Sequence, residues 1–483
     1  MSKILHSRYL KYAIILLLGV VAFAVLLATS NAKYVFQKNK DMNIDASYFK
    51  FESIKDENND VVAYAVTGYV GPDENITIPS TWQGKPVTQI GNGSWSYSKA
   101  KYLTIPESVT TIAENAFSGY SNLTKIEFKS NSQLNTIGKR AFSSCGSLES
   151  ITIPKKVQTI GNNAFVYSGL TTVAFEDNSQ LNTIGEEVFT NCQKLISITF
   201  GKDSQLNTIG KRAFSSCSSL GSITIPTSVK TIDNNAFASS GLTTVAFEKD
   251  SKLATIGEEV FKTCSKLDSI TIPKSVNTIG YNAFASSGLT TVEFEKDSQL
   301  NKISHYAFSK CKNLASITIP KNVQTIAHNA FASSGLTTVA FENDSQLTTI
   351  ASNVFSGCES LTSIKFGEKS KITQISNYAF SGCSSLKSIV IPSNVTDIGE
   401  YAFKQCSDLV NVTFTKENNL KYIYKEAFSG CSSLKSIVIP LNVTRIGDNA
   451  FYNCSNLKTI YYRGENQEAW NNEKTKISAT GND

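Results

Sequence analysis

The sequence contains very little histidine, the residue most often used in metal and acid–base sites. Its 483 residues include only three histidines and two methionines. It contains no G-x-S-x-G, H-E-x-x-H or phosphate-binding loop motif. We therefore predict no enzymatic activity, no catalytic residue, no cofactor and no bound metal.

A strong excess of charge of one sign is also lacking. The sequence has 46 Lys and Arg against 40 Asp and Glu, which gives a net charge of +6, and the two signs are interspersed. A nucleic-acid-binding protein would need basic residues gathered in a patch or stripe. We therefore exclude nucleic acid from the expected partners.

Long hydrophobic runs are absent after the N-terminus. The single run, from Ala13 to Ala28, follows Lys3, Arg8 and Lys11 and precedes small residues that suit cleavage. This pattern is typical of a secretory signal peptide, although the run is also long enough for an uncleaved membrane anchor. We assign residues 1–32 to a signal peptide or membrane anchor and favour the signal peptide. The protein is therefore expected to be secreted or displayed on the cell surface.

What the sequence does have is a regular series of phenylalanines. Fifteen of them are separated by 23, 24 or 25 residues: Phe117, Phe142, Phe165, Phe189, Phe214, Phe237, Phe261, Phe284, Phe308, Phe331, Phe355, Phe380, Phe403, Phe428 and Phe451. A repeat of this length cannot bury its own apolar face and must stack on its neighbours. We predict a solenoid with one continuous core.

Each repeat combines a strand pattern with a turn pattern. In the repeat that begins at Leu267, the apolar residues Ile270 and Ile272 alternate with polar ones, which is typical of a strand with one buried face. Pro273 should end the strand, because proline cannot donate to a ladder. Gly280 should permit a tight bend, and the Ala-Phe pair that follows should lie on a short helical turn with its phenylalanine inside.

The ten cysteines all follow a repeat phenylalanine by three residues: Cys145, Cys192, Cys217, Cys264, Cys311, Cys358, Cys383, Cys406, Cys431 and Cys454. Three of them, Cys145, Cys264 and Cys311, have no cysteine in either adjacent repeat, and two repeats span ~10 Å, beyond disulfide reach. The others should point in parallel along the stack. We predict a row of buried free thiols in place of a disulfide framework.

The consensus L-x-x-I-x-I-P-x-x-V-x-x-I-G-x-x-A-F-x-x-C recurs from Leu123 to Ile460 and resembles the BspA-type leucine-rich repeats. The resemblance implies a leucine-rich-repeat solenoid, mostly β with short helical turns, in which about 15 repeats of 23–25 residues form a curved stack of parallel strands. We place an N-terminal capping region at residues 33–94 and the solenoid at 95–462. A C-terminal cap and tail, with Trp470, should occupy 463–483.

The outward strand positions predict a face rich in serine and threonine with few charges. One interpretation is a generic hydrated strand surface, because threonine suits a strand and serine keeps it wet. The other is a broad binding face for glycans or an extended protein. The residues that we select as the candidate binding surface are Ser269, Thr271, Thr291, Ser316, Thr318, Thr338, Val390, Thr413, Val438 and Tyr461.

The C-terminal third of this face should be more apolar, because it includes Val390, Val438 and Tyr461. Four more tyrosines occur in nearby repeats: Tyr378, Tyr401, Tyr422 and Tyr424. Exposed aromatic and aliphatic side chains indicate a contact patch, with packing near the end of the solenoid as the alternative.

Two groups of titratable residues share one exposed region of the repeat. His305 and His328 occupy the same position in adjacent repeats and should stack, and acidic pairs occur at 186–187 and 258–259. Carboxylate catalysis needs two groups that converge across a cleft. We expect a convex rim here, with no cleft, and hence no site.

The family resemblance implies a surface protein of the kind commonly described as an adhesin. We therefore expect an extracellular or cell-surface protein that binds a macromolecule, namely a host matrix protein, a glycan or a cell surface, through its repeats. The alternative is a structural spacer or surface-coat protein without a dedicated ligand. A membrane should be involved only through an uncleaved N-terminal segment.

Cleavage of the N-terminal segment predicts that the exported protein begins soon after Ala32. An intact-mass measurement of the protein recovered from the secreted or surface fraction checks this. A chain that retains Met1 and stays with the membrane would instead show that the segment is an anchor.

Overall fold

The computed structural model describes residues 45–93, 95, 98–415 and 417–462. The expected signal peptide or anchor at 1–32 and the expected C-terminal cap at 463–483 lie outside the described residues. In the described part of the chain, no helical segment has the length and apolarity of a membrane span. The described residues from Ser47 to Tyr462 form one compact unit.

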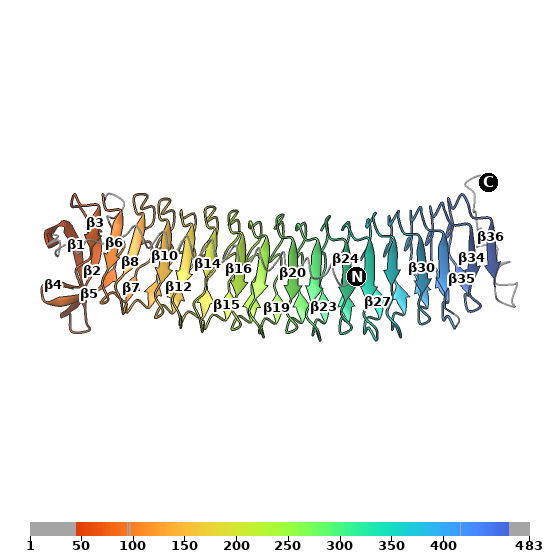
Figure 1. Ribbon diagram of the computed structural model, residues 1–483, viewed down its shortest axis with the longest axis horizontal. Coiled ribbons are helices and arrows are strands. Elements are labelled where there is room, and N and C mark those ends of the chain that lie inside the picture. The colour runs from red at the N-terminus through yellow and green to blue at the C-terminus, as the bar shows by residue number, and fades with distance from the viewer. Residues whose placement is uncertain (1–44, 94, 96–97, 416, 463–483) are drawn as a thin grey trace, which may run out of the picture. The chain divides into compact units, whose positions relative to one another are not determined.

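Each repeat forms one turn of a solenoid, and the turns stack side by side in a long, gently bowed row (Figure 1). A turn consists of a long strand, a short strand and a segment of consecutive backbone turns. The long strands from the third turn onward are β8 (Lys125–Phe128), β10 (Ser150–Ile153), β12 (Thr172–Phe175), β14 (Ser197–Thr199), β16 (Ser222–Ile225), β18 (Thr244–Phe247), β20 (Ser269–Ile272), β22 (Thr291–Phe294), β24 (Ser316–Ile319), β26 (Thr338–Phe341), β28 (Ser363–Lys365), β30 (Ser388–Ile391), β32 (Asn411–Phe414), β34 (Ser436–Ile439) and β36 (Thr459–Tyr462).

The short strands contain two residues each and form a second face of the solenoid. They are β7 (Thr111–Ile112), β9 (Thr136–Ile137), β11 (Thr159–Ile160), β13 (Thr183–Ile184), β15 (Thr208–Ile209), β17 (Thr231–Ile232), β19 (Thr255–Ile256), β21 (Thr278–Ile279), β23 (Lys302–Ile303), β25 (Thr325–Ile326), β27 (Thr349–Ile350), β29 (Gln374–Ile375), β31 (Asp397–Ile398), β33 (Tyr422–Ile423) and β35 (Arg445–Ile446).

The N-terminal end of the stack begins with a short 3-10 helix and a hairpin. The elements there are η1 (Ala46–Tyr48), β1 (Phe49–Lys55), β2 (Val61–Tyr69), β3 (Asn75–Thr77), β4 (Thr81–Trp82), β5 (Lys85–Ile90) and β6 (Tyr102–Ile105). The antiparallel pair β1–β2 extends the sheet of short strands through β5, and the Phe51 ring stacks on Trp82 at 4.3 Å. The hairpin thereby covers the first turn of the solenoid.

Parallel pairing keeps equivalent residues of successive turns in register. On the long-strand face, Ile151 pairs with Val173 and Val173 with Ile198. The strands β3 and β6 pair in the same parallel way, so that the described residues contain 17 long-strand turns, two more than the phenylalanines count. The predicted parallel solenoid is therefore confirmed with a slightly larger repeat number.

The repeat phenylalanines form a continuous stack inside the solenoid. Neighbouring rings from Phe117 to Phe451 lie 5.0–5.6 Å apart between centroids, with interplanar angles of 2–19°. Trp95 closes the N-terminal end of this stack at 5.1 Å from Phe117. The rings are buried, so each one loses its water only when both neighbouring turns are in place.

The cysteines form the expected row of buried free thiols. Each Sγ contacts the carbonyl oxygen of the phenylalanine that belongs to the preceding turn, as Cys264 does with Phe237 at 3.1 Å. Where the neighbouring turn has serine in place of cysteine, its hydroxyl meets the thiol, as in the pair Ser240 and Cys264 at 3.4 Å. Burial raises the pKa of the Cys264 thiol to about 11, so the thiol stays protonated at neutral pH.

The prediction that the Ala-Phe pair lies on a short helical turn is wrong, because this segment forms consecutive backbone turns. Its amides alternate: Ala283 donates to Gly280 within the segment, whereas Phe284 donates to Ala307 of the next turn. Asn282 and Ser286 have φ of 52° and 56°, and equivalent residues in the other repeats are also left-handed. A helix would tolerate neither the left-handed residues nor the loss of its internal hydrogen bonds.

Gly280 is explained by close approach and not by a bend with positive φ. A Cβ atom at this position would lie 2.5 Å from the Gly257 carbonyl oxygen of the preceding turn. The Gly280 backbone can therefore lie against the Gly257 carbonyl group because Gly280 has no side chain.

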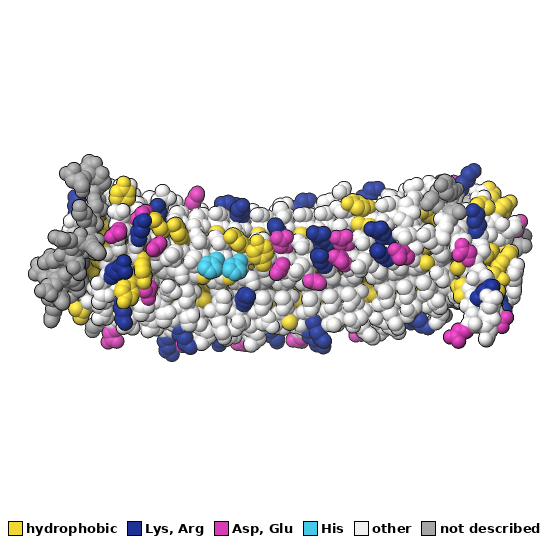
Figure 2. All heavy atoms as spheres, turned by 180° about the vertical axis from the view of Figure 1, so that it is seen from behind, with side chains coloured by type: hydrophobic (Ala, Val, Ile, Leu, Met, Phe, Trp, Pro, Cys, Tyr) yellow, Lys and Arg dark blue, Asp and Glu magenta, His cyan; other side chains and the backbone are white. Residues whose placement is uncertain are grey.

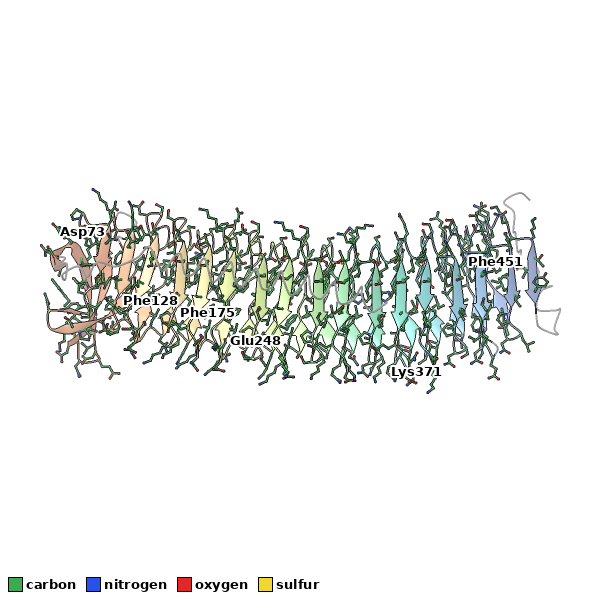
Figure 3. All side chains as sticks on the ribbon, viewed as in Figure 1. Asp73, Phe128, Phe175, Glu248, Lys371 and Phe451 are labelled. Carbon is green, nitrogen blue, oxygen red and sulfur yellow. The ribbon has the colours of Figure 1, made fainter. Side chains whose placement is uncertain are left out.

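Glutamates directly after the long strands β12, β18, β22 and β26 link neighbouring turns at the edge of the solenoid. Glu248, labelled in Figure 3, accepts a hydrogen bond from the Thr227 amide at 2.8 Å. That amide directly follows the proline that ends β16. In the same way Glu176, Glu295 and Glu342 accept hydrogen bonds from the backbone amides of Lys155, Lys274 and Lys321, respectively. These carboxylates satisfy a backbone donor where the proline has interrupted the ladder.

Removal of one ring from the phenylalanine stack should weaken the contact between neighbouring turns, so that the two parts of the solenoid unfold separately. We expect Phe284→Ala to cost about 3–5 kcal/mol, because it leaves a cavity in a fully buried site. Urea unfolding followed by circular dichroism should then show two transitions, since each turn is stabilised only by its neighbours. Thr291→Ala, an exposed change in the next turn, serves as the control and should unfold as the wild type does. Equal stability of the two variants would contradict the stack.

The thiol row predicts a loss of stability at alkaline pH. The folded state holds Cys264 protonated up to about pH 11, whereas the unfolded thiol ionises near its ordinary pKa of 9.0. Between these values the unfolded state binds fewer protons, so stability falls as pH rises and is fully present below pH 9. Replacement by serine, which occupies the equivalent position at 240 and 287, removes one such group.

Urea midpoints of the wild type and of Cys264→Ser at pH 8 and pH 10 test this effect. The variant should lose less stability over that interval, by about 1.4 kcal/mol. Parallel losses in the two proteins would show that this thiol is not buried as described.

Candidate binding surfaces

The ten residues selected from the sequence all lie on the outward side of the long strands. Ser269, Thr291, Ser316 and Thr338 pair with one another in turn and form one row of exposed hydroxyls across β20 to β26. Thr271 and Thr318 belong to the parallel row beside it, which the exposed Glu293 interrupts. The structure thus assembles the hydroxyl-rich face, which we call the long-strand face.

The C-terminal end of the long-strand face carries an apolar strip. Val390 pairs with Thr413, and Val438 pairs with Tyr461. Val390 is 53% exposed and Tyr461 is 56% exposed, whereas Val438 is half-buried. An exposed valine and tyrosine at the end of a polar face are of the kind that anchors protein contacts.

The four nearby tyrosines do not join this strip. Tyr378 and Tyr401 lie in the turn segment and stack on each other at 4.7 Å, with the Lys404 ammonium 4.7 Å above the Tyr401 ring. Tyr422 lies in the short strand β33, and Tyr424 follows it and donates to Asp397 at 3.3 Å. The apolar patch expected at the C-terminal third is therefore divided between different sides of the solenoid.

The two histidines stack as expected and remain exposed. Their ring centroids are 5.4 Å apart with an interplanar angle of 4°. Figure 2 shows the pair in cyan on the face formed by the turn segments, where acidic and basic side chains alternate along the stack. Within the described ranges, no three His, Cys, Asp or Glu residues are arranged to hold a metal.

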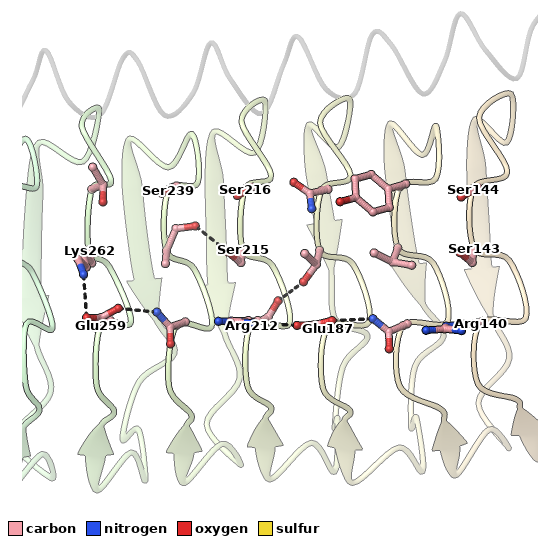
Figure 4. Close-up of a pocket in the computed structure, with 18 of the residues that line it drawn as sticks. Arg140, Ser143, Ser144, Glu187, Arg212, Ser215, Ser216, Ser239, Glu259 and Lys262 are labelled. Carbon is pink, nitrogen blue, oxygen red and sulfur yellow. Dashed lines mark hydrogen bonds and ion pairs between the residues drawn. The ribbon is translucent and has the colours of Figure 1, made fainter.

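The expectation that this region has no cleft is wrong. A shallow groove of about 810 Å³ runs across the turn segments of seven successive turns, from Asn115 to Thr263. Figure 4 shows its lining residues in three parallel rows, one for each of three positions in the turn segment. Its middle row is made of short side chains directly after the repeat phenylalanines: Ser118, Ser143, Val166, Thr190, Ser215 and Ala238. The same position in the next turn holds Lys262, whose long side chain ends the row of short ones.

Sequence analysis missed the groove because the row of short residues was hidden within a segment expected to be helical. The two flanking rows come from the left-handed positions, which direct their side chains away from the core. Arg140, Glu187 and Arg212 have φ of 53°, 57° and 53°. The signal that could have revealed the groove is the run of short residues after successive phenylalanines.

The charged residues of the groove neutralise one another. Glu187 accepts hydrogen bonds from Asn163 at 2.7 Å and from Arg212 at 3.2 Å. Glu259 accepts one from Asn235 at 2.8 Å and one from Lys262 at 2.7 Å. The dashed lines in Figure 4 trace this network along one edge of the groove.

The same network lowers the pKa of both carboxyl groups. For Glu187 the largest cause is the Asn163 hydrogen bond, with Arg212 adding to it against the effect of burial. For Glu259 burial is the largest single effect and raises the pKa, but hydrogen bonds from Lys262, Asn235 and Asn282 together outweigh it. Both carboxylates are therefore ionised at neutral pH and act as fixed acceptors and not as proton donors.

The sequence profile of the BspA type leucine-rich repeat region matches five overlapping segments that together span residues 88–472. The chain belongs to this family. Members of the family are cell-surface proteins, and their repeats act as binding scaffolds. The recognition made from the consensus sequence is thereby confirmed.

One solved structure of a bacterial leucine-rich-repeat protein has the same fold, and two others are similar to the chain at lower TM-scores. A leucine-rich repeat protein from Bacteroides ovatus is 24% identical, with 87% of this chain and 94% of that chain covered, at a TM-score of 0.53. A leucine rich cell surface protein from Faecalibacterium prausnitzii is 26% identical over 90% of this chain and 97% of that one, at a TM-score of 0.40. The pneumococcal vaccine antigen PcpA is 21% identical over 76% and 97%, at a TM-score of 0.44. No curated protein matches the chain.

Proposed function

We propose that this protein is a secreted or cell-surface adhesin that recognises a host matrix protein, a glycan or another cell through its long-strand face. The family supports a surface binding scaffold, and the finer assignment rests on the surface itself. The observation that carries it is the row of exposed hydroxyls from Ser269 to Thr338, which successive strands hold in fixed register.

A rigid periodic surface favours binding by many weak contacts. Each strand contributes two outward side chains, and the backbone that carries them is already ordered, so little conformational entropy is lost on binding. The apolar strip at Val390, Val438 and Tyr461 would supply stronger contacts at one end. The uniformity of the hydroxyl rows also suits a spacer or surface coat, which is the competing function.

Lysine substitutions on the long-strand face should weaken adhesion without unfolding the protein. Lys365 already occupies the row of Thr271 and Thr318, so the double variant Thr271→Lys, Thr318→Lys fits the fold. The purified exported chain is assayed against immobilised extracellular-matrix proteins, a glycan array and intact cells. We expect saturable binding to one of these, weakened about tenfold or more in the double variant, because bulky charges would displace the contact surface.

The matched control is Thr325→Lys on the short-strand face, where Lys302 of the preceding turn holds the equivalent position. This variant should bind as the wild type does. A second pair, Val390→Thr and Val438→Thr, copies Thr413 and tests the apolar strip separately. Absence of wild-type binding to all three panels would support the spacer or coat function and contradict the adhesin.

A further inference from the structure

The groove across the turn segments has the chemistry of a binding site that is separate from the long-strand face. Its length is set by the stacking of seven turns, whose phenylalanine rings follow at steps of 5.0–5.6 Å between Phe117 and Phe261. A ligand that fills it must therefore be an extended chain and not a compact small molecule.

The charge of the groove argues against an ionic ligand. Its charged lining residues are Arg140, Arg212 and Lys262 against Glu187 and Glu259, so the balance is a single positive charge. Four of these five are already paired within the network. A polyanion such as a nucleic acid would need several unpaired cations in a row, and a polycation would need free carboxylates.

The apolar lining argues against a protein segment held by side-chain anchors. Only Val166, Ala238 and the Tyr167 ring contribute apolar groups, and the first two are small and nearly buried. Peptide recognition usually depends on pockets for larger apolar side chains or on free backbone groups at a sheet edge. The backbone amides of these turn segments are instead paired with neighbouring turns, as Phe189 is with Ala213.

What the groove offers is a dense set of uncharged hydrogen-bonding groups. Within the described part of the chain, no hydrogen bond engages the side chains of Ser143, Ser144, Asn191, Ser216, Ser239 and Thr263. The Arg140 guanidinium adds donors at one end, with no carboxylate within 4.0 Å among the described residues. Such a surface complements a ligand that itself carries many hydroxyl groups.

Tyr167 provides the one large ring at the groove. It is 61% exposed, and its φ of 57° is unfavourable for a bulky residue. The equivalent positions in other turns hold smaller residues, among them Ser144, Ser216 and Ser239. An exposed ring in a costly conformation beside hydrogen-bonding groups offers an apolar face on which a sugar ring can stack.

We propose that this groove binds a neutral oligosaccharide chain, with Tyr167 stacking on one sugar and the serine, asparagine and arginine side chains bonding to its hydroxyls. The inference does not depend on adhesion through the long-strand face, because it concerns other residues on another side of the solenoid. Both a host glycan and a microbial wall glycan have this chemistry.

The experiment measures binding of the purified exported chain to neutral oligosaccharides by glycan array and calorimetry. The probes are chitotetraose, laminarihexaose and mannohexaose, with heparin as a charged comparison. A wild-type preference among chitotetraose, laminarihexaose and mannohexaose identifies the sugar and linkage that fit the groove.

Two substitutions test the site, and each copies a residue that the fold already accepts. Tyr167→Ser copies Ser144 of the preceding turn, and Ser215→Lys places lysine where Lys262 stands two turns later. Each should weaken binding about tenfold or more, the first by loss of the stacked ring and the second by obstruction of the groove. Ala332→Lys, the same position in a turn outside the groove, is the matched control and should leave binding unchanged.

Retention of glycan binding in Thr271→Lys, Thr318→Lys would assign it to the groove and not to the long-strand face. The proposal is overturned if the wild type binds none of the neutral probes, if it binds only heparin, or if Tyr167→Ser and Ser215→Lys bind as tightly as Ala332→Lys. These results leave adhesion to matrix proteins or cells through the long-strand face untouched, because that adhesion is tested by its own variants and its own panels.

Discussion

The structure depends on the stacking of equivalent residues in successive turns. Each turn buries its phenylalanine between the rings of the turns before and after it, at spacings of 5.0–5.6 Å. Because no turn can remove its own apolar residues from water, the free energy of folding lies in the contacts between turns. The thiols, the strand ladders and the alternating amides of the turn segments all follow the same rule, since each pairs with its counterpart one turn away.

In-register stacking also determines what the surface can do. Any residue type that recurs at one position of the repeat becomes a row along the solenoid. Serine and threonine at the outward strand positions become the hydroxyl rows of the long-strand face, and short residues after the phenylalanines become the floor of a groove. The glutamates and arginines of the turn segments fall into one line, where they neutralise each other. The candidate binding surfaces are therefore rows of equivalent side chains from successive turns, and not clusters of residues brought together from distant parts of the chain.

The core residues were predicted correctly from the sequence, because the same apolar residue types recur at the same position of each repeat. Phe284, Cys264 and Ile270 were all assigned to the interior from spacing alone, and each is buried.

The conformation of the turn segment was less predictable. Its left-handed residues include Arg140, Glu187 and Tyr306, which have no intrinsic preference for that conformation, so pairing with the next turn must impose it. The groove was missed for the same reason, since its rows exist only when the segment is not a helix. The long-strand face was assembled as predicted, because alternation along a strand is read directly from sequence.

The central claim, that equivalent residues form continuous rows with one step per repeat, is tested most directly by distances between spin labels. Thr172, Thr244 and Thr338 are exposed in β12, β18 and β26, three and seven turns apart from the first. Cysteines introduced there can be labelled selectively, because the native thiols are buried. One variant carries labels at positions 172 and 244, and a second carries labels at positions 172 and 338. Pulsed electron paramagnetic resonance should give distances in these two variants that are in the ratio of three turns to seven turns. Distances unrelated to the number of intervening repeats would contradict the stacked solenoid and with it both proposed binding surfaces.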